Sequence, residues 1–420
     1  MSDTTTHAPT GTTTADSRPG GRTARLVKAA LLVVLLVVLL VLPLYIDEFW
    51  LSTGFAVCGA IVGALGLNLL VGTTGQLSLA HAFFLAVGAT TYSFVSGSPG
   101  GLANKHGGLG WPPLVGMIAG VVLAGAAGLL FSPIAARLRG IYLGVASLGL
   151  VFVGQHLLNT WTTVTGGFNG RTTPPFSLFG FSFTSDHPYL AILGVPFGSA
   201  ERLWYLGLIL ALGAYLFARN LVRSRPGRAL QTLRDSEVAA AVMGVNVQGY
   251  KARAFFVSSL YAGLSGVLLA LSIGSIAPES FGLDVSVQYL AMIVLGGLGS
   301  MGGAVLGAIV VSALPLVFQQ YADSLPLVSA PGEGGVSAGL AARFLYGAFV
   351  VLIVLFEPAG LAGLARRFRR SPRPEPDSAS ASDSGSAPES GAGPSASRQD
   401  SPEPTRPSTS TVRTDSTEGA

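Results

Sequence analysis

Four neutral polar side chains that interrupt apolar stretches are the best candidates for acting on a solute. Asn68, Gln76, Ser78 and His81 lie within 14 consecutive residues. Their amide, hydroxyl and imidazole groups hydrogen-bond polar molecules. The apolar segments hold no Asp, Glu or Lys away from their ends, whereas secondary carriers and proton pumps usually place such groups there. These residues therefore predict a neutral translocation path that needs an external energy source. For His81 the alternative is a packing histidine that bonds a neighbouring carbonyl.

The nucleotide-binding motifs are absent or lack their structural context. A Walker A loop needs a lysine directly after glycine, but the three lysines follow Val, Asn and Tyr; they are Lys28, Lys105 and Lys251. This chain is therefore expected to bind no ATP and no other cofactor itself. Gly297–Gly302 matches the dinucleotide fingerprint, yet the residues after it are apolar on every helical face, which favours a glycine-rich break between two membrane helices.

Two further patterns carry no catalytic prediction. Gly335–Gly339 has the spacing of a nucleophile elbow but follows no predicted strand, so chance explains it better. The single cysteine, Cys58, excludes an intrachain disulfide and any multi-cysteine metal site. No metal site is expected.

The elements that must position these residues are membrane helices. The chain of 420 residues is 50% hydrophobic and only 11% charged, against about 25% charged in an ordinary soluble domain. An all-α integral membrane protein with about ten transmembrane helices is predicted over residues 26–365. Polar tails at 1–25 and 371–420 are predicted to be disordered. The expected spans are Ala29–Ile46, Trp50–Gly72, Leu79–Gly97, Pro112–Phe131, Ile141–Thr160, Leu203–Leu221, Ala254–Ile276, Val285–Gly299, Ala304–Tyr321 and Phe344–Phe356.

Basic residues are distributed unevenly between the loops of this topology. Seventeen Lys and Arg fall on one side and four on the other, which by the positive-inside rule places both termini in the cytoplasm. The bases stand between apolar stretches instead of along one groove or helix face, so no nucleic-acid partner is expected.

The predicted cytoplasmic segment with the most sequence signals is the loop at residues 223–251. Pro226 and Gly227 predict a turn, and an apolar stripe follows it on a short helix. Asp235 or Ser236 can cap a second short helix, which Gly244 would end in a left-handed conformation. A solvated loop has no reason to keep a run of Ala, Val and Met, so a docking knob is favoured over an ordinary loop.

This loop resembles the EAA-type coupling loop of ABC importer permeases, in particular the Liv-type branched-chain amino acid permeases. The match covers Gly227, Arg228, Ala229, Arg234, Asp235, Glu237, Ala239, Ala240, Met243 and Gly244. Three other blocks are similar to family signatures: 66–81, where Ala80 replaces an expected glycine, 295–300, and 356–361, where Glu357 replaces a usual basic residue.

The resemblance implies the permease subunit of an ATP-driven importer in a bacterial cytoplasmic membrane, with branched-chain amino acids as cargo. It implies four kinds of partner: a homologous permease subunit, ATP-binding cassette ATPase subunits that use the ATP, an extracytoplasmic substrate-binding protein and membrane lipid. The residues expected to couple to the ATPases are Gly227, Arg228, Arg234, Asp235, Glu237, Ala240 and Gly244, and those expected along the path are Asn68, Gln76, Ser78 and His81.

Three other functions stay open. Urea and small-amide permeases share the same blocks. A channel or secondary carrier working alone would transport without nucleotide. A membrane-anchored interaction protein would act through the C-terminal tail.

Overall fold

The chain divides into two units, Met1–Arg370 and Ser371–Ala420. The computed structural model describes residues 30, 33–100, 107–138, 140–178, 181–183, 191–192, 195–196 and 198–321, and near the end 341, 344–345, 347–348, 351–352, 355 and 360–363. The predicted tails at 1–25 and 371–420, the Gly335–Gly339 pattern and part of the predicted span at Phe344–Phe356 lie outside the described residues.

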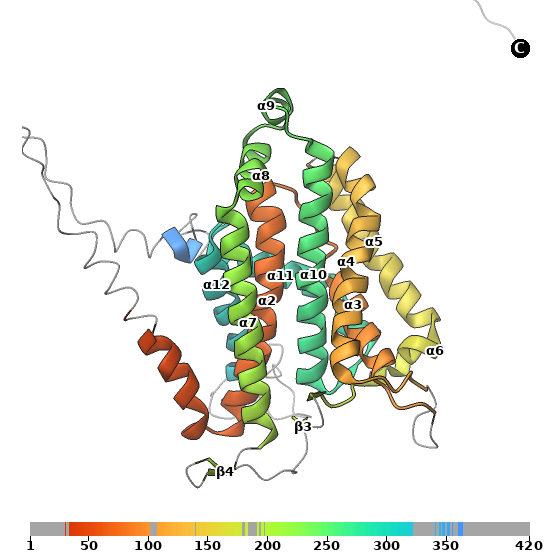
Figure 1. Cartoon of the computed structure of the whole chain (residues 1–420), viewed down its shortest axis with the longest axis vertical. Helices are drawn as coiled ribbons and strands as arrows, with labels where there is room; N and C mark the ends of the chain where they lie inside the picture. Colours follow the sequence, from red (N-terminus) through yellow and green to blue (C-terminus); the bar gives the residue numbers. More distant parts are fainter. Residues whose placement is uncertain are drawn as a thin grey trace, which may run out of the picture. The chain divides into compact units, whose positions relative to one another are not determined.

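Five long apolar helices dominate the described residues (Figure 1). At about 1.5 Å per residue, 20 residues cross the roughly 30 Å of a bilayer core. These five contain 20 to 27 residues each, so the protein is an α-helical, multi-pass membrane protein. They are α2 with its continuation η2 (Glu48–Gly72), α4 (Pro113–Arg137), α5 (Ile141–Thr160), α7 (Ser199–Arg223) and α10 (Val247–Ile273).

Shorter elements account for other predicted spans. The first predicted span corresponds to an apolar helix at Val33–Leu44, which includes the 3₁₀ turn η1 (Leu42–Leu44). The others are α3 (His81–Val95), α11 (Leu283–Gly296) and α12 (Met301–Gln320). The structure thus confirms the helical class and shows a helix at each of the first nine predicted spans, while the count of ten crossings stays a prediction.

Helix α10 is the central packing element, since it contacts α2, α3 and α4. Glycines allow the close approach: a Cβ atom at Gly88 would lie 2.3 Å from the carbonyl oxygen of Gly263, and one at Gly266 would lie 2.0 Å from that of Leu85. Apolar side chains gain nothing by moving from lipid to another helix, so membrane helices associate mainly through close van der Waals packing. Small residues are common at such contacts because they let the two backbones approach.

The helical hairpin of α11 and α12 turns at Gly297–Ser300. Gly297 and Gly299 both adopt positive φ angles, 103° and 80°, which residues with a Cβ rarely adopt. The prediction that this glycine-rich stretch breaks two membrane helices is confirmed, and no βαβ unit surrounds it in the described chain.

The helix that begins with α2 is interrupted before α3. It passes into the π-helix η2 (Asn68–Gly72), and Gly75 has a φ of 71°. An irregular segment then runs to Ala80 between helices. Hydroxyls satisfy its amides: Ser147 Oγ accepts from Leu79 N at 2.8 Å. Irregular backbone is tolerated at membrane depth only with such internal partners.

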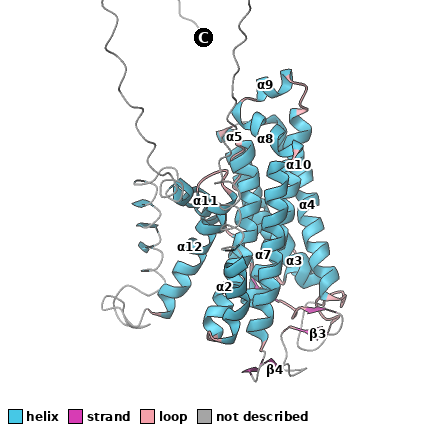
Figure 2. Cartoon of the chain, turned by 60° about the vertical axis from the view of Figure 1, so that its left-hand side comes forward, coloured by secondary structure: helices cyan, strands magenta, loops and turns pink. Residues whose placement is uncertain are grey.

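Short α8 (Arg225–Asp235) and α9 (Glu237–Val242) form one end of the helix bundle in the Met1–Arg370 unit (Figure 1). Two-residue strands lie at the opposite end (Figure 2). Their pairs are antiparallel: β1 (Arg171–Thr172) with β6 (Ser275–Ile276), β2 (Ser177–Leu178) with β3 (Phe181–Ser182), and β4 (Ala191–Ile192) with β5 (Val195–Pro196). The same end holds α6 (Thr162–Thr165), η3 (Gly167–Asn169) and η4 (Pro278–Phe281).

Candidate functional site

The α8–α9 protrusion is built by local sequence signals. Ser224 caps α8, Ser236 caps α9 by accepting from Ala239 N at 3.2 Å, and Gly244 follows α9 with a φ of 80°. The predicted second cap and glycine stop are therefore confirmed. The predicted turn at Pro226 is wrong: Pro226 lies in the first turn of α8, where its missing N–H costs no hydrogen bond.

The apolar face of α8 is buried, but most of α9 is not. Leu230 and Leu233 of α8 are 7% and 2% exposed. On α9, Ala240 is fully buried. Its neighbours Val238, Val242 and Met243 are 69%, 83% and 64% exposed. These three form the α9 apolar surface. An apolar surface on a protrusion is typical of a protein-docking site.

Arg234 joins this protrusion to the helix bundle. Its Nη1 donates to the carbonyl oxygen of Gly72 at 2.6 Å. A Cβ atom at Gly299 would lie 3.1 Å from the same Nη1, and one at Gly75 would lie 3.3 Å from Cγ of Arg234. The last residues of η2 and the α11–α12 turn therefore meet at one guanidinium.

Asn68 holds η2 against the same turn. Its Nδ2 donates to the carbonyl oxygen of Ser300 at 3.2 Å, and its Oδ1 accepts from Gly299 N at 2.9 Å. The side chain is fully buried. Gly360 also packs against the α11–α12 turn, since a Cβ there would lie 2.6 Å from Gly297 N. All four sequence blocks that carry the family resemblance thus converge at the α8 end.

Glu237 forms the second link between protrusion and bundle. Its Oε1 lies 2.6 Å from Nζ of Lys251 in α10, and the side chains are 26% and 2% exposed. Glu237 is the first residue of α9, where the helix dipole favours an anion.

The remaining predicted coupling residues have distinct surroundings. Arg228 is exposed, and its Nη1 lies 3.4 Å from the carbonyl oxygen of Arg223. Asp235 is exposed at the end of α8. Gly227 is buried, and no larger residue fits there: a Cβ atom would lie 2.3 Å from the carbonyl oxygens of Leu221 and Val222.

The predicted path residues are buried inside the chain. Gln76, Ser78 and His81 are 6%, 3% and 2% exposed. The amide of Gln76 and Nε2 of His81 have no hydrogen-bond partner among the described residues. A route along these side chains would require the surrounding helices to separate.

A polar cluster that the sequence did not reveal lies behind His81. The His81 ring is 4.9 Å from the Tyr289 ring. The Tyr289 hydroxyl is 2.9 Å from Ser265 Oγ, which donates to the carbonyl oxygen of Gly59 at 2.7 Å. Tyr289 carries no local signal within its apolar run, so only the three-dimensional contact identifies it.

The comparisons with known proteins agree with the convergence of these blocks. Residues 52–354 match the model of a family described as the permease component of branched-chain amino acid transport systems. The chain belongs to this family.

Two LivM relatives cover about three quarters of this permease. It is 32% identical over 317 residues to the high-affinity branched-chain amino acid transport system permease protein LivM of Escherichia coli K12, covering 73% of this chain and 68% of that protein. A probable LivM of Methanocaldococcus jannaschii is 23% identical, with 76% and 89% covered. The autoinducer 2 import permease LsrC of E. coli O9:H4 is 27% identical over 41% of this chain and 47% of its own. No solved structure matches.

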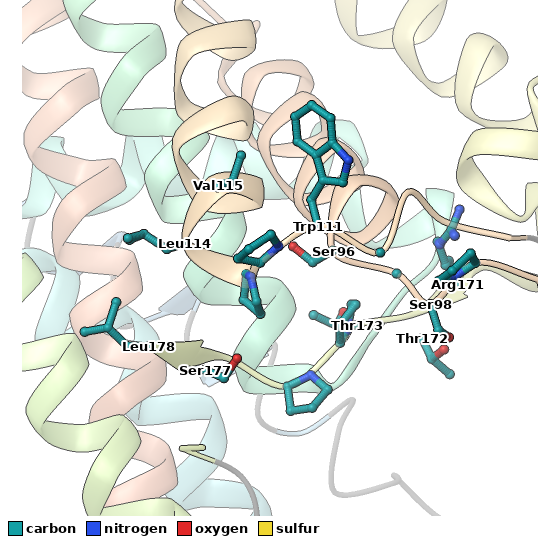
Figure 3. Close-up of a pocket in the computed structure, with 17 residues that line it drawn as sticks. Ser96, Ser98, Trp111, Leu114, Val115, Arg171, Thr172, Thr173, Ser177 and Leu178 are labelled. Atoms are coloured by element: carbon teal, nitrogen blue, oxygen red, sulfur yellow. The ribbon is translucent and has the colours of Figure 1, made fainter. Parts of the chain in front are cut away.

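The end of the permease opposite to α9 contains a cavity of about 1090 Å³. Figure 3 shows Ser96 and Trp111 on one side of it and Thr173 and Ser177 on the other. Arg171 is the one charged side chain among the lining residues that the structure describes.

Arg171 is part of the cavity wall. Its Nη1 donates to the carbonyl oxygen of Val164 at 2.9 Å, and its guanidinium lies 5.3 Å from the centre of the Phe94 ring. Burial lowers the pKa of Arg171 from its ordinary value. These contacts tie the loop after α5 to the end of α3.

Proposed function

We propose that this permease subunit imports branched-chain amino acids, driven by ATPase subunits that dock on α9. The observation that carries the proposal is the α9 apolar surface, on a protrusion held to the bundle by Arg234 and Glu237. Support for the cargo comes from the family description and from the names of the LivM relatives. The chain itself holds no ATP and no other cofactor in this proposal, since its sequence has no Walker A loop.

The proposed arrangement crosses the cytoplasmic membrane ten times, with both termini and α9 inside. The uneven distribution of Lys and Arg supports it. A homologous permease subunit completes the pathway, and an extracytoplasmic substrate-binding protein delivers cargo to the end that contains Arg171. Gly227, Arg228, Arg234, Asp235, Glu237, Ala240 and Gly244 form the coupling region in this proposal, and Asn68, Gln76, Ser78 and His81 line the path.

Docking can be tested by placing a charge on the α9 apolar surface. Val242→Asp should lower co-purification of the ATPase subunits by about tenfold or more, because a desolvated carboxylate opposes association. Gln248→Asp is the matched control, since Gln248 is exposed in the first turn of α10. Equal recovery of ATPase with Val242→Asp and with wild type would contradict docking on α9.

Cargo and energy source are tested in proteoliposomes that contain the complete transporter and its binding protein. We expect uptake of labelled leucine with ATP and none with a non-hydrolysable analogue. Leucine uptake that ignores ATP would remove the importer mechanism. ATP-dependent uptake of urea without leucine would select the small-amide alternative.

A further inference from the structure

Lys251 is a buried cation in α10, only 2% exposed. The other two lysines of the chain, Lys28 and Lys105, lie outside the described residues. The Nζ atom of Lys251 lies 2.6 Å from Oε1 of Glu237. Removing an ammonium from water is costly, and the loss is offset only when an anion lies close in good geometry. The buried charge therefore favours conformations in which α9 stays next to α10.

Helix α9 has little other attachment to the bundle through its own side chains. Ala240 is its one buried residue. Val238 and Val242 are largely exposed. With so little apolar burial, the ion pair of Glu237 and Lys251 is the main side-chain contact that fixes the beginning of α9 on the bundle.

The connection from α9 to α10 is short and held by local hydrogen bonds. Val245 N donates to the carbonyl oxygen of Ala240 at 3.0 Å. Asn246 caps α10 by accepting from Gly249 N at 3.0 Å. The ion pair closes this turn from the other side, so that α9 and the start of α10 form one closed unit.

Helix α10 runs from this turn into the centre of the bundle. Beyond Lys251, α10 packs on α3 and α4 through very close contacts. A Cβ atom at Gly128 would lie 2.0 Å from Ser259 Oγ, and one at Gly88 would lie 2.3 Å from the carbonyl oxygen of Gly263. Closely packed helices move together more readily than they deform. A displacement of the start of α10 would therefore be passed to α3 and α4.

We propose that Lys251 is a positioning residue that makes α9 and α10 move as one, so that displacement of α9 by the ATPases reorients α10. This inference rests on the proposed function, because it needs a partner that pushes on α9. Without the ion pair, α9 would yield at its connecting turn, and ATP hydrolysis would continue with little transport.

The test measures uptake per ATP hydrolysed by the complete reconstituted transporter. Lys251→Met should lower this ratio by about tenfold, within the usual range of coupling free energies. The charge swap Glu237→Lys with Lys251→Glu should restore most of the ratio, because the pair is re-formed with opposite polarity. Arg253→Met is the matched control: Arg253 is an exposed cation on the same helix, 5.4 Å from the Tyr250 ring centre.

The outcomes separate this inference from the proposed function. A wild-type transporter that recruits no ATPase, or ignores ATP, refutes the proposed function before any variant is made. An unchanged ratio in Lys251→Met overturns the inference. So does loss of assembly in the single variants that the charge swap does not repair, since that would assign Lys251 a folding role.

Discussion

The guanidinium of Arg234 and the carbonyl of Gly72 are joined by a hydrogen bond of 2.6 Å, although 162 residues separate them in sequence. Arg234 is the penultimate residue of α8, and Gly72 is the last residue of η2. The bond therefore connects the protrusion to the interrupted helix that leads into the predicted path. It involves other residues than the ion pair that connects Glu237 to α10.

Arg234→Ala should reduce ATP-dependent uptake while leaving membrane insertion intact. Hydrogen bonds to charged groups contribute about 1.5–3 kcal/mol. If this bond couples the motion of α8 to the helix bundle, its loss should lower uptake about tenfold or more. Arg234→Lys keeps a single donor and should recover part of the activity. Arg225→Ala is the control, because Arg225 is exposed at the other end of α8. Full uptake by Arg234→Ala would show that this contact is dispensable.

Asn68→Leu should destabilise the folded permease. The substitution leaves Gly299 N without its acceptor and removes one of two donors to the Ser300 carbonyl, which keeps the bond from Ala304 N. A lost hydrogen bond typically costs about 0.5–1.5 kcal/mol. The measurement is the melting temperature in detergent, followed by fluorescence-detected gel filtration. Asn159→Leu provides the comparison, since Asn159 is exposed and bonds within its own helix. Equal melting temperatures for the two variants would show that the hydrogen bonds of Asn68 do not stabilise the contact between η2 and the α11–α12 turn.

The sequence was sufficient to predict the helical class and most helix positions, because a membrane span is a local property of composition. The predicted span Ile141–Thr160 matches α5 in both bounds. The predicted span Leu79–Gly97 starts two residues early. The helical hydrogen bonds of α3 start at the carbonyl oxygen of Ala80, which accepts from Phe83 N and Phe84 N. Leu79 lies before them and is held by a tertiary bond to Ser147 of another helix.

The α8–α9 protrusion and its contacts were predicted only in part, because only some of these features depend on residues that are neighbours in the sequence. Caps and glycine stops are local, so Ser236 and Gly244 could be assigned from neighbouring residues. The partners of Glu237 and Asn68 could not be assigned, because Lys251 and Ser300 are brought to them by the fold. The sequence does offer one signal, a rare lysine at the edge of an apolar helix, which indicates a buried pair when an acid lies on the adjoining loop.

Gly88→Ala should weaken the contact between α3 and α10. The added Cβ would lie 2.3 Å from the carbonyl oxygen of Gly263, which is backbone and cannot rotate away. Overpacking of this kind costs about 1–3 kcal/mol, so the melting temperature in detergent should fall. Gly213→Ala is the control: nothing lies within 4 Å of a Cβ there, and it should be neutral or slightly stabilising. A Gly88→Ala variant as stable as Gly213→Ala would contradict this packing.

Ser286→Ala should destabilise the first turn of α3, directly after the break, by removing the acceptor of a buried amide. Ser286 is 1% exposed, and its Oγ accepts from Ala82 N at 3.0 Å. An unpaired amide at that depth costs about 1–3 kcal/mol, so the melting temperature should drop. Ser52→Ala removes an exposed hydroxyl that bonds only within its own helix region, and it should have little effect.

A second hydroxyl makes the test of this break more specific. Ser147 supports Leu79 N from α5, whereas Ser286 supports Ala82 N from α11. The two amides belong to one short segment, so a first loss that already loosens it should make the second less costly. The double variant should therefore lose less stability than the sum of the single losses, because neighbouring sites are not additive. Strict additivity would show that each hydroxyl acts alone and that the segment does not respond as a unit.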